Sequence, residues 1–122
     1  MLNLNSINIG TMQVEVMQKF WQEVIDKKPD MEEAGMKGWV VGATFLGVME
    51  HSEMGGQAKD PGRVMFNLET SDVKGEFERI SKIEGVKVVK EPYSMGEHNE
   101  FWIATLADPD GNYFQLVSPW NN

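Results

Sequence analysis

Few side chains of this protein could carry acid–base or metal chemistry. Its 122 residues include no cysteine and two histidines, His51 and His98. The absence of cysteine excludes disulfides, thiolate nucleophiles and cysteine-based zinc sites, and so few histidines exclude a multi-histidine metal centre. The candidates for a general acid or base are His98, Glu50 and Glu69. The alternative for each of them, and for His51, is an ordinary solvated side chain.

The charge balance restricts the partners of the chain. Acidic residues outnumber basic ones by 19 to 11, which gives a formal net charge of −8 and an isoelectric point of about 4.7. A phosphate backbone would repel such a chain, so we expect no nucleic acid partner. The acidic balance suits a cationic ligand, and it equally suits plain solubility.

Hydropathy indicates a soluble protein. No run approaches the ~20 apolar residues of a membrane span, so we expect no membrane partner. The first residues lack the basic region and apolar core of a signal peptide. We therefore expect a cytoplasmic location.

Apolar periodicity predicts the elements that must position the candidate residues. Alternation predicts a strand over 2–10. Val14, Met17, Phe20 and Val24 recur at helical spacing, which predicts a helix that ends near Asp26. Residues 29–35 are polar and predict a loop or at most a short strand. Paired strands are expected at 38–41 and 44–49, followed by a loop over 54–62.

The second half repeats this order. A strand is expected over 64–69, then a helix that Ser71 or Asp72 caps and Gly85 terminates. Residues 86–89 predict a strand that closes at Pro92, and 93–99 predict a loop. Further strands are expected at 101–104 and 113–117, separated by turn residues at 108–112.

The two halves therefore form an internal repeat. Residues 8–11 (Asn-Ile-Gly-Thr) align with residues 67–70 (Asn-Leu-Glu-Thr), and Trp39 has an expected counterpart in Trp102. The expected fold class is α+β: one domain over 1–122, with paired βαβββ modules at about 2–51 and 63–119. These modules would form a curved mixed sheet with helices on the outer face and a concave opposite face.

Residues 108–116, Asp-Pro-Asp-Gly-Asn-Tyr-Phe-Gln-Leu, resemble the closing motif of the vicinal oxygen chelate superfamily. That superfamily includes glyoxalase I, bleomycin-resistance proteins and extradiol dioxygenases. Phe20 and Trp21 resemble the aromatic pair of its first helix, and residues 66–73 resemble the start of its second module. The resemblance covers residues 2–119. It implies paired βαβββ modules, a homodimer and a concave cavity that holds a divalent metal in the enzymes.

The positions that hold the metal in that superfamily carry other residue types in this chain. In metal-bearing members the ligands lie on the first and last strands of each module, and motif spacing carries these positions to Ser6, Gly47, Met65 and Gln115. None of the four is a histidine or a carboxylate, and this set is a poor one for a hard cation. We therefore predict that the metal site is lost and that no cofactor is needed, which disfavours glyoxalase I and dioxygenase activity. A divalent metal held with Glu50 or Glu69 is the alternative.

Strand parity separates a packing face from a cavity face. The helix-facing residues are uniformly apolar, whereas the opposite residues mix amides with aromatics, as small-molecule pockets do. Amides paired with each other, with water or across a dimer seam are the alternative. Trp39 and Trp102 could stack on a ligand or pack in the core, and Arg63 could pair with an anionic substrate or be an edge charge. The expected cavity lining consists of Ser6, Asn8, Trp39, Phe45, Gly47, Met65, Asn67, Trp102, Tyr113 and Gln115.

These observations predict a metal-independent member of the superfamily that binds a small organic molecule in its cavity, as a homodimer. Drug sequestration and metal-free catalysis both remain open. The alternative is a metal-dependent lyase, isomerase or dioxygenase with a non-standard metal site. A third interpretation is a structural dimer without a ligand. The identity of the ligand does not follow from the sequence.

Overall fold

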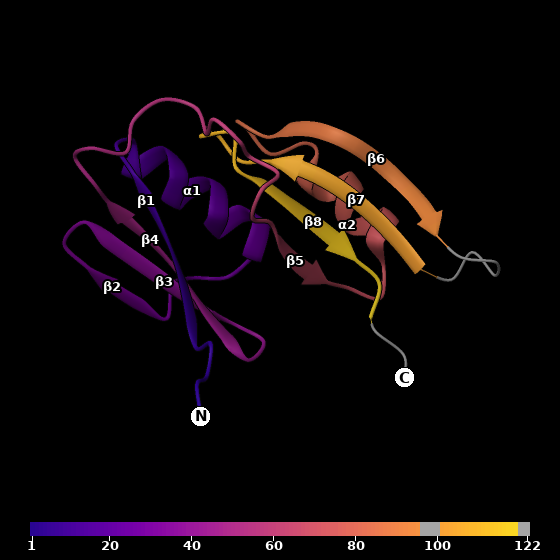
Figure 1. Cartoon of the computed structure of the whole chain (residues 1–122), viewed down its shortest axis with the longest axis horizontal. Helices are drawn as coiled ribbons and strands as arrows, with labels where there is room; N and C mark the ends of the chain where they lie inside the picture. Colours follow the sequence, from indigo (N-terminus) through magenta and orange to yellow (C-terminus); the bar gives the residue numbers. More distant parts are fainter. Residues whose placement is uncertain (96–100, 120–122) are drawn as a thin grey trace. The chain divides into compact units, whose positions relative to one another are not determined.

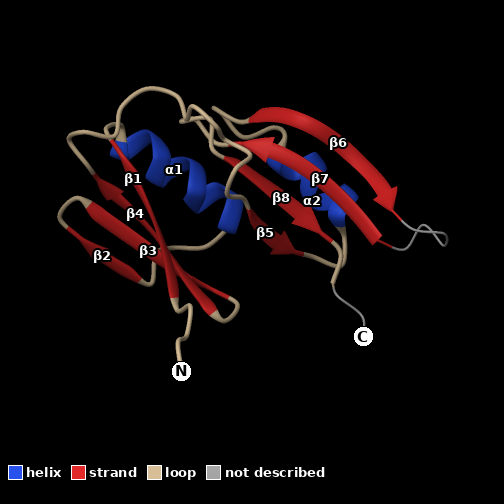
Figure 2. Ribbon diagram, in the orientation of Figure 1, coloured by secondary structure: helices blue, strands red, loops and turns tan. Residues whose placement is uncertain are grey.

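The computed structural model describes residues 1–95 and 101–119. The chain divides into two compact units, Met1–Gly56 and Gln57–Asn122. Each unit contains one four-stranded mixed sheet and one helix that packs on it (Figures 1 and 2). The α+β fold class expected from the repeat is therefore confirmed. No helix within the described residues has both the length and the hydropathy that crossing a membrane requires.

The first unit contains β1 (Ser6–Thr11), α1 (Val14–Ile25), β2 (Met31–Glu33), β3 (Met36–Val41) and β4 (Thr44–Glu50). Its strand order is β1-β4-β3-β2, in which β1 is parallel to β4 and the other neighbours are antiparallel. The apolar side of α1 packs against β1, β3 and β4. Phe20 and Trp21 are fully buried there and meet edge to face, with ring centroids 5.5 Å apart, a favoured aromatic geometry.

An ion pair closes the connection between α1 and β2. The Asp30 carboxylate accepts a hydrogen bond from the Val40 backbone N–H at 2.7 Å and lies 2.9 Å from Lys27 Nζ. The Val40 hydrogen bond, followed by the contact with Lys27, holds the pKa of the Asp30 carboxyl below its ordinary value of 3.8. Because that pKa is lowered, the contact stabilises the fold above pH 3.8 and is lost as the pH falls through the lower folded value.

The second unit contains β5 (Phe66–Glu69), α2 (Val73–Ile80), β6 (Lys87–Met95), β7 (Phe101–Ala107) and β8 (Tyr113–Val117). Its strand order is β5-β8-β7-β6, with β5 parallel to β8 and the other neighbours antiparallel. The helix α2 packs on β6, β7 and β8. This connectivity repeats that of the first unit strand for strand.

The two helices also begin in the same way. Thr11 Oγ1 accepts a hydrogen bond from the Gln13 N–H at 3.0 Å, and Thr70 Oγ1 accepts one from the Asp72 N–H at 3.1 Å. These threonines occupy matching positions in the aligned segments 8–11 and 67–70. Each turns the chain from a strand into a helix by satisfying a backbone donor. Asp72 adds a cap, because its Oδ1 accepts the Gly75 N–H at 3.0 Å.

β6 differs from its expected extent. The strand does not close at Pro92 but continues to Met95, so residues 93–95 of the expected loop belong to the strand. The rest of that expected loop, 96–99, lies outside the described residues. Its pairing with β7 shifts register between Val88 and Lys90 and again between Lys90 and Tyr93. β6 lies at the edge of its sheet, where a proline removes no needed ladder donor and a bulge is tolerated.

The turn between β7 and β8 is organised by the Asp108 carboxylate. Asp108 is 2% exposed. Its Oδ1 accepts hydrogen bonds from the backbone N–H groups of Asp110 and Asn112 at 3.0 and 2.9 Å, and the Asn112 side-chain amide donates to both carboxylate oxygens. Gly111 supplies the positive φ of 86° that the turn requires. The motif that carried the family resemblance therefore has a clear structural role.

Replacing Asp108 by alanine should destabilise the protein by about 2–4 kcal/mol, because buried backbone donors lose their acceptor. Urea denaturation followed by far-UV circular dichroism measures this change. The matched control is Glu78→Ala, which removes an exposed carboxylate 3.9 Å from Lys82 and should change stability by less than about 0.5 kcal/mol. Equal unfolding midpoints for the two variants would contradict the role of Asp108.

Candidate functional site

Each sheet has one face covered by its own helix and one face that this helix does not cover, which we call the helix-free face. Strand parity assigns the side chains. In the second unit Phe114 and Leu116 are buried on the helix side, so Tyr113 and Gln115 lie on the helix-free face. In the first unit Leu46 and Val48 are likewise buried beneath α1, and Phe45 and Gly47 lie on the opposite face.

The helix-free face of the second unit carries a row of polar side chains across its strands. Asn67 on β5 pairs with Gln115 on β8, and Gln115 pairs with Thr105 on β7. Gln115 Nε2 donates to Thr105 Oγ1 at 3.0 Å. This bond fixes the Gln115 amide and leaves its Oε1 as an acceptor. Among the described residues no hydrogen bond involves the Asn67 side-chain amide. The row can therefore donate and accept hydrogen bonds at neighbouring points.

The matching row of the first unit carries almost no polar groups. Asn8 on β1 pairs with Gly47 on β4, and Gly47 pairs with Gly38 on β3. A β-carbon at Gly38 would overlap the Phe45 ring, and one at Gly47 would lie 2.5 Å from Asn8 Oδ1 and 3.0 Å from the Met36 methyl. The two glycines thus make room for these three side chains. This face offers an aromatic ring, a thioether and one amide.

The register shows where the four positions expected for metal ligands lie. Ser6 pairs with Phe45 rather than Gly47, and its hydroxyl donates to Asn5 Oδ1 at 3.0 Å. Met65 precedes β5 altogether and is 39% exposed. Asn8 lies beside Gly47 and Asn67 lies beside Gln115. Each is two residues further along the chain than the expected position, Ser6 or Met65. Strand pairing does not identify the ligand positions of the superfamily, so Ser6, Gly47, Met65 and Gln115 stay predictions.

The side chains that meet at Gly47 and Gln115 do not form a donor set that fits a divalent metal centre. Asn8, Asn67 and Gln115 supply neutral amides, and Gly47 supplies no side chain. Divalent ions need carboxylates, imidazoles or thiolates among their ligands. Within the described residues no group of three or more histidine, aspartate or glutamate side chains is placed to hold a metal ion.

Both tryptophans expected in the cavity lie on the helix sides instead. Trp39 pairs with buried Leu46, is fully buried, and donates its Nε1–H to the Lys27 carbonyl at 3.1 Å. Trp102 lies beneath α2, where Lys74 Nζ is 3.9 Å from its ring centroid, a cation–π contact. They are also not counterparts. The partner of Trp39 in the repeat is Leu106, which pairs with Phe114 as Trp39 pairs with Leu46.

The acid–base candidates lie apart. Glu69 is exposed and shares the helix-free face with Asn67. Glu50 ends β4 with the parity of Leu46 and Val48, on the helix side. His51 is exposed, and its Nδ1 accepts a hydrogen bond from the Glu53 N–H at 3.2 Å. His98 lies outside the described residues. The structure thus brings one of these groups, Glu69, to the face that carries the polar row.

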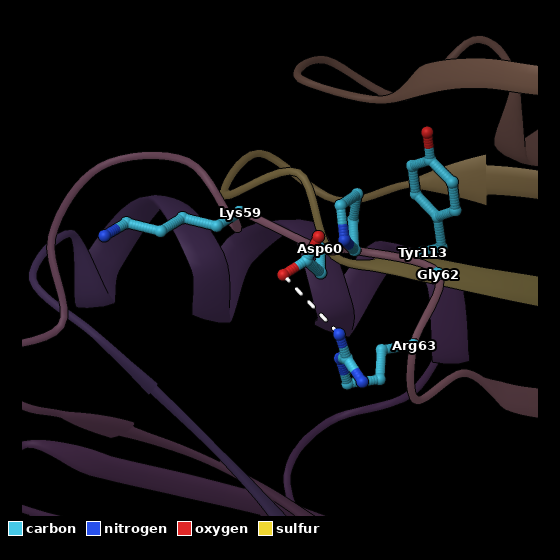
Figure 3. Close-up of a pocket in the computed structure, with 6 residues that line it drawn as sticks. Lys59, Asp60, Gly62, Arg63 and Tyr113 are labelled. Atoms are coloured by element: carbon cyan, nitrogen blue, oxygen red, sulfur yellow. Dashed lines mark ion pairs between the residues drawn. The ribbon is translucent and has the colours of Figure 1, made fainter.

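A pocket adjoins this face in the second unit (Figure 3). Its volume is about 440 Å³, within the range of small-molecule sites. Figure 3 shows Arg63 and Asp60 directed toward each other, Lys59 extending away from them, and Tyr113 rising from β8. Sequence reasoning placed Tyr113 in the lining but missed the loop, because nothing local indicates that it folds onto β8. The lining consists of Lys59, Asp60, Pro61, Gly62, Arg63 and Tyr113.

The turn at 108–112 holds the beginning of the pocket loop. The Ala58 N–H donates to the Asp110 carbonyl at 2.9 Å, and Gln57 Nε2 donates to the Pro109 carbonyl at 3.0 Å. At the other end, the Arg63 N–H donates to the Asp60 carbonyl at 3.1 Å. These bonds tie the loop to the start of β8, so the pocket is a feature of the second unit alone.

The fit between Gly38 and Phe45 can be tested by a double-mutant cycle. Gly38→Ala should destabilise the protein by about 1–3 kcal/mol, because the new methyl group displaces the Phe45 ring. In a Phe45→Ala background the same change should be neutral or stabilising, since alanine suits a strand better than glycine does. Urea denaturation of the four proteins gives the coupling free energy. A coupling near zero would show that the ring does not lie over Gly38.

Comparison with known proteins now identifies the family. Residues 6–117 match the model of the glyoxalase-like domain. No protein of curated function matches the sequence significantly. A glyoxalase-related enzyme from Fulvimarina pelagi aligns at a TM-score of 0.77 and 14% identity, covering 98% of this chain and 89% of its own. A glyoxalase/bleomycin resistance protein/dioxygenase family enzyme from Burkholderia phytofirmans aligns at 0.75 and 20%, covering 96% and 98%.

A fosfomycin resistance protein from Mesorhizobium loti aligns similarly, at a TM-score of 0.76 and 16% identity, covering 98% of this chain and 94% of its own. Identities this low establish a shared fold and not a shared activity. The family model, in contrast, spans both units and includes the strands that carry Asn8, Asn67 and Gln115. The chain therefore belongs to the glyoxalase-like domain family, within the vicinal oxygen chelate superfamily.

Proposed function

We propose that this protein binds a small organic molecule on its helix-free faces without using a metal ion. The observation that carries this function is the row formed by Asn67, Gln115 and Thr105. The row consists of neutral amides and a hydroxyl, and none of these groups is an ionisable metal ligand. Such groups orient a ligand by hydrogen bonds and supply specificity in an otherwise apolar site.

The helix-free faces of the two units suit different chemical groups. The second unit offers hydrogen-bonding groups in adjacent positions, held by the bond from Gln115 to Thr105. The first unit offers the Phe45 ring and the Met36 side chain over paired glycines. Apolar surface provides binding free energy in proportion to the area removed from water. The face of the second unit therefore suits a polar group, and the face of the first unit, taken by itself, suits an apolar group.

A metal-dependent lyase, isomerase or dioxygenase is the second candidate, and Glu69 is the observation that favours it. Glu69 lies on the same face as Gln115 and Asn67. It is two residues beyond Asn67 on β5, which makes it a diagonal neighbour of Gln115. Three oxygen donors of this kind could contribute to the coordination of a hard cation. One carboxylate among neutral amides gives weak affinity, so we rank this function second.

A thermal-shift screen of small molecules in excess EDTA tests the first candidate. A ligand at a hundred times its dissociation constant should stabilise the protein by about 2.7 kcal/mol. Gln115→Ala should weaken that ligand about tenfold, because one hydrogen bond and the order of the row are lost. Gln22→Ala, the same change on α1 and away from the row, should leave the affinity unchanged.

The same assay separates the two candidates. Mn²⁺, Ni²⁺, Zn²⁺ and Fe²⁺ should give no stabilisation at stoichiometric concentration if the site is metal-independent. A metal-induced shift that disappears in Glu69→Gln would instead establish the second candidate. If Gln115→Ala and Gln22→Ala change the affinity for the ligand equally, the row is not the binding site.

We also propose a homodimer in the cytoplasm. Apolar side chains such as Val40, Val64 and Met95 are about half or more exposed in the single chain, and exposed apolar surface favours association. Sedimentation equilibrium at micromolar concentration should therefore give twice the chain mass of 13.8 kDa. A single species of the chain mass would contradict this expectation.

A further inference from the structure

The pocket formed by residues 59–63 and Tyr113 carries an unusual charge for this protein. The chain as a whole has 19 acidic and 11 basic residues. The pocket, in contrast, is lined by two basic residues, Lys59 and Arg63, and one acidic residue, Asp60. Positive charge therefore exceeds negative charge in this pocket, although the chain as a whole is acidic. Because salt screens a charge beyond about 10 Å, a ligand in the pocket responds mainly to these nearby charges, which favour an anion.

Arg63 is available to a ligand, as comparison with the other arginine of the chain shows. Arg79 forms a two-point pair with Glu76, through Nε at 3.2 Å and Nη2 at 2.9 Å. Arg63 has a single carboxylate partner among the described residues, Asp60. The distance from Arg63 Nη2 to Asp60 Oδ2 is 3.9 Å, which is long for an ion pair. The Arg63 side chain is 77% exposed and that of Asp60 73%. Such a loose and solvated pair holds the guanidinium weakly.

The wall beside Arg63 suits a flat apolar body. Pro61 and Tyr113 line the pocket, and the loop approaches the ring so closely that a β-carbon on Gly62 would lie 3.5 Å from Tyr113 Cδ2. Aromatic and proline side chains stack well on planar groups. Tyr113 also shares its strand face with Gln115, two residues away, a separation of roughly 7 Å.

We propose that Arg63 binds the carboxylate of a small ligand whose planar or apolar body lies along Tyr113 toward the polar row. A guanidinium presents paired N–H donors that match a carboxylate. Asp60 competes with the ligand for Arg63 and so limits the affinity. This subsite deepens the function proposed above and rests on it, since it names the anionic end of the same ligand.

Titration with three probes of one shape tests the charge preference. Benzoate, benzamide and benzylamine share a ring and differ in carrying a negative, neutral or positive group. In ¹H–¹⁵N correlation spectra of the full chain, benzoate should shift the amide signals of residues 59–63 and Tyr113 at the lowest concentration. Benzylamine should cause no shift there. Phenylphosphonate distinguishes a carboxylate site from a general oxyanion site, and equal binding of both would overturn the choice of carboxylate.

Two substitutions in the pocket should act in opposite directions. Arg63→Gln should weaken benzoate binding about tenfold, because a charge-assisted pair is lost. Arg63→Lys keeps the positive charge and should therefore weaken binding less. Asp60→Asn should strengthen binding about two- to fivefold, because the competing carboxylate is removed. Arg79→Gln is the matched control and should have no effect. Both pocket residues are exposed, so these variants should fold normally.

The outcomes separate this inference from the function on which it rests. Unchanged affinity in Arg63→Gln, or equal binding of benzylamine and benzoate, would overturn the carboxylate subsite. If benzamide alone shifts Asn67, Thr105 and Gln115, the helix-free face binds ligands but the subsite does not exist. If no probe and no screened compound perturbs either set of residues, both proposals fail.

Discussion

The hydrogen bonds accepted by the Asp108 carboxylate are the interaction on which the second unit depends. One buried side chain satisfies the backbone donors of Asp110 and Asn112 and so fixes the turn between β7 and β8. That turn sets the register that brings Gln115 beside Thr105. Its carbonyl groups also receive the hydrogen bonds of Gln57 and Ala58, which begin the pocket loop. The polar row and the pocket therefore share one structural origin.

The repeat explains how one scaffold can present two different surfaces. Both units keep the parts that fold the chain, including the threonine that turns a strand into a helix and the buried apolar side of the sheet. On the opposite face the matching positions diverge: Gly47 corresponds to Gln115 and Gly38 to Thr105. Because alternate residues of a strand face opposite sides, these substitutions alter the helix-free face without disturbing the core.

This separation also determines how much the sequence could predict. Strong periodicity defined α1, α2 and the helix-facing core, and the turn motif defined β8 with Gln115 and Tyr113. Trp39 and Trp102 were misplaced because a tryptophan inside an apolar run gives no sign of its strand parity. The pairing of Asn67 with Gln115 joins distant strands, so the alternation of one strand alone could not predict it. The contact of Gly62 with Tyr113 joins residues about 50 apart in the chain, and no local pattern reports such a contact.

Net charge and site charge are separate properties in a protein of this size. The formal charge of −8 belongs to the whole surface, and at physiological ionic strength a charge acts over roughly 8 Å. A ligand at the pocket therefore responds mainly to the guanidinium of Arg63 and to its loosely held partner Asp60. The acidic average, which by itself suggests a cationic ligand, still acts at longer range by slowing the approach of anions. An anionic ligand would accordingly bind through close contacts rather than through attraction from a distance, and added salt would weaken the contact while easing the approach.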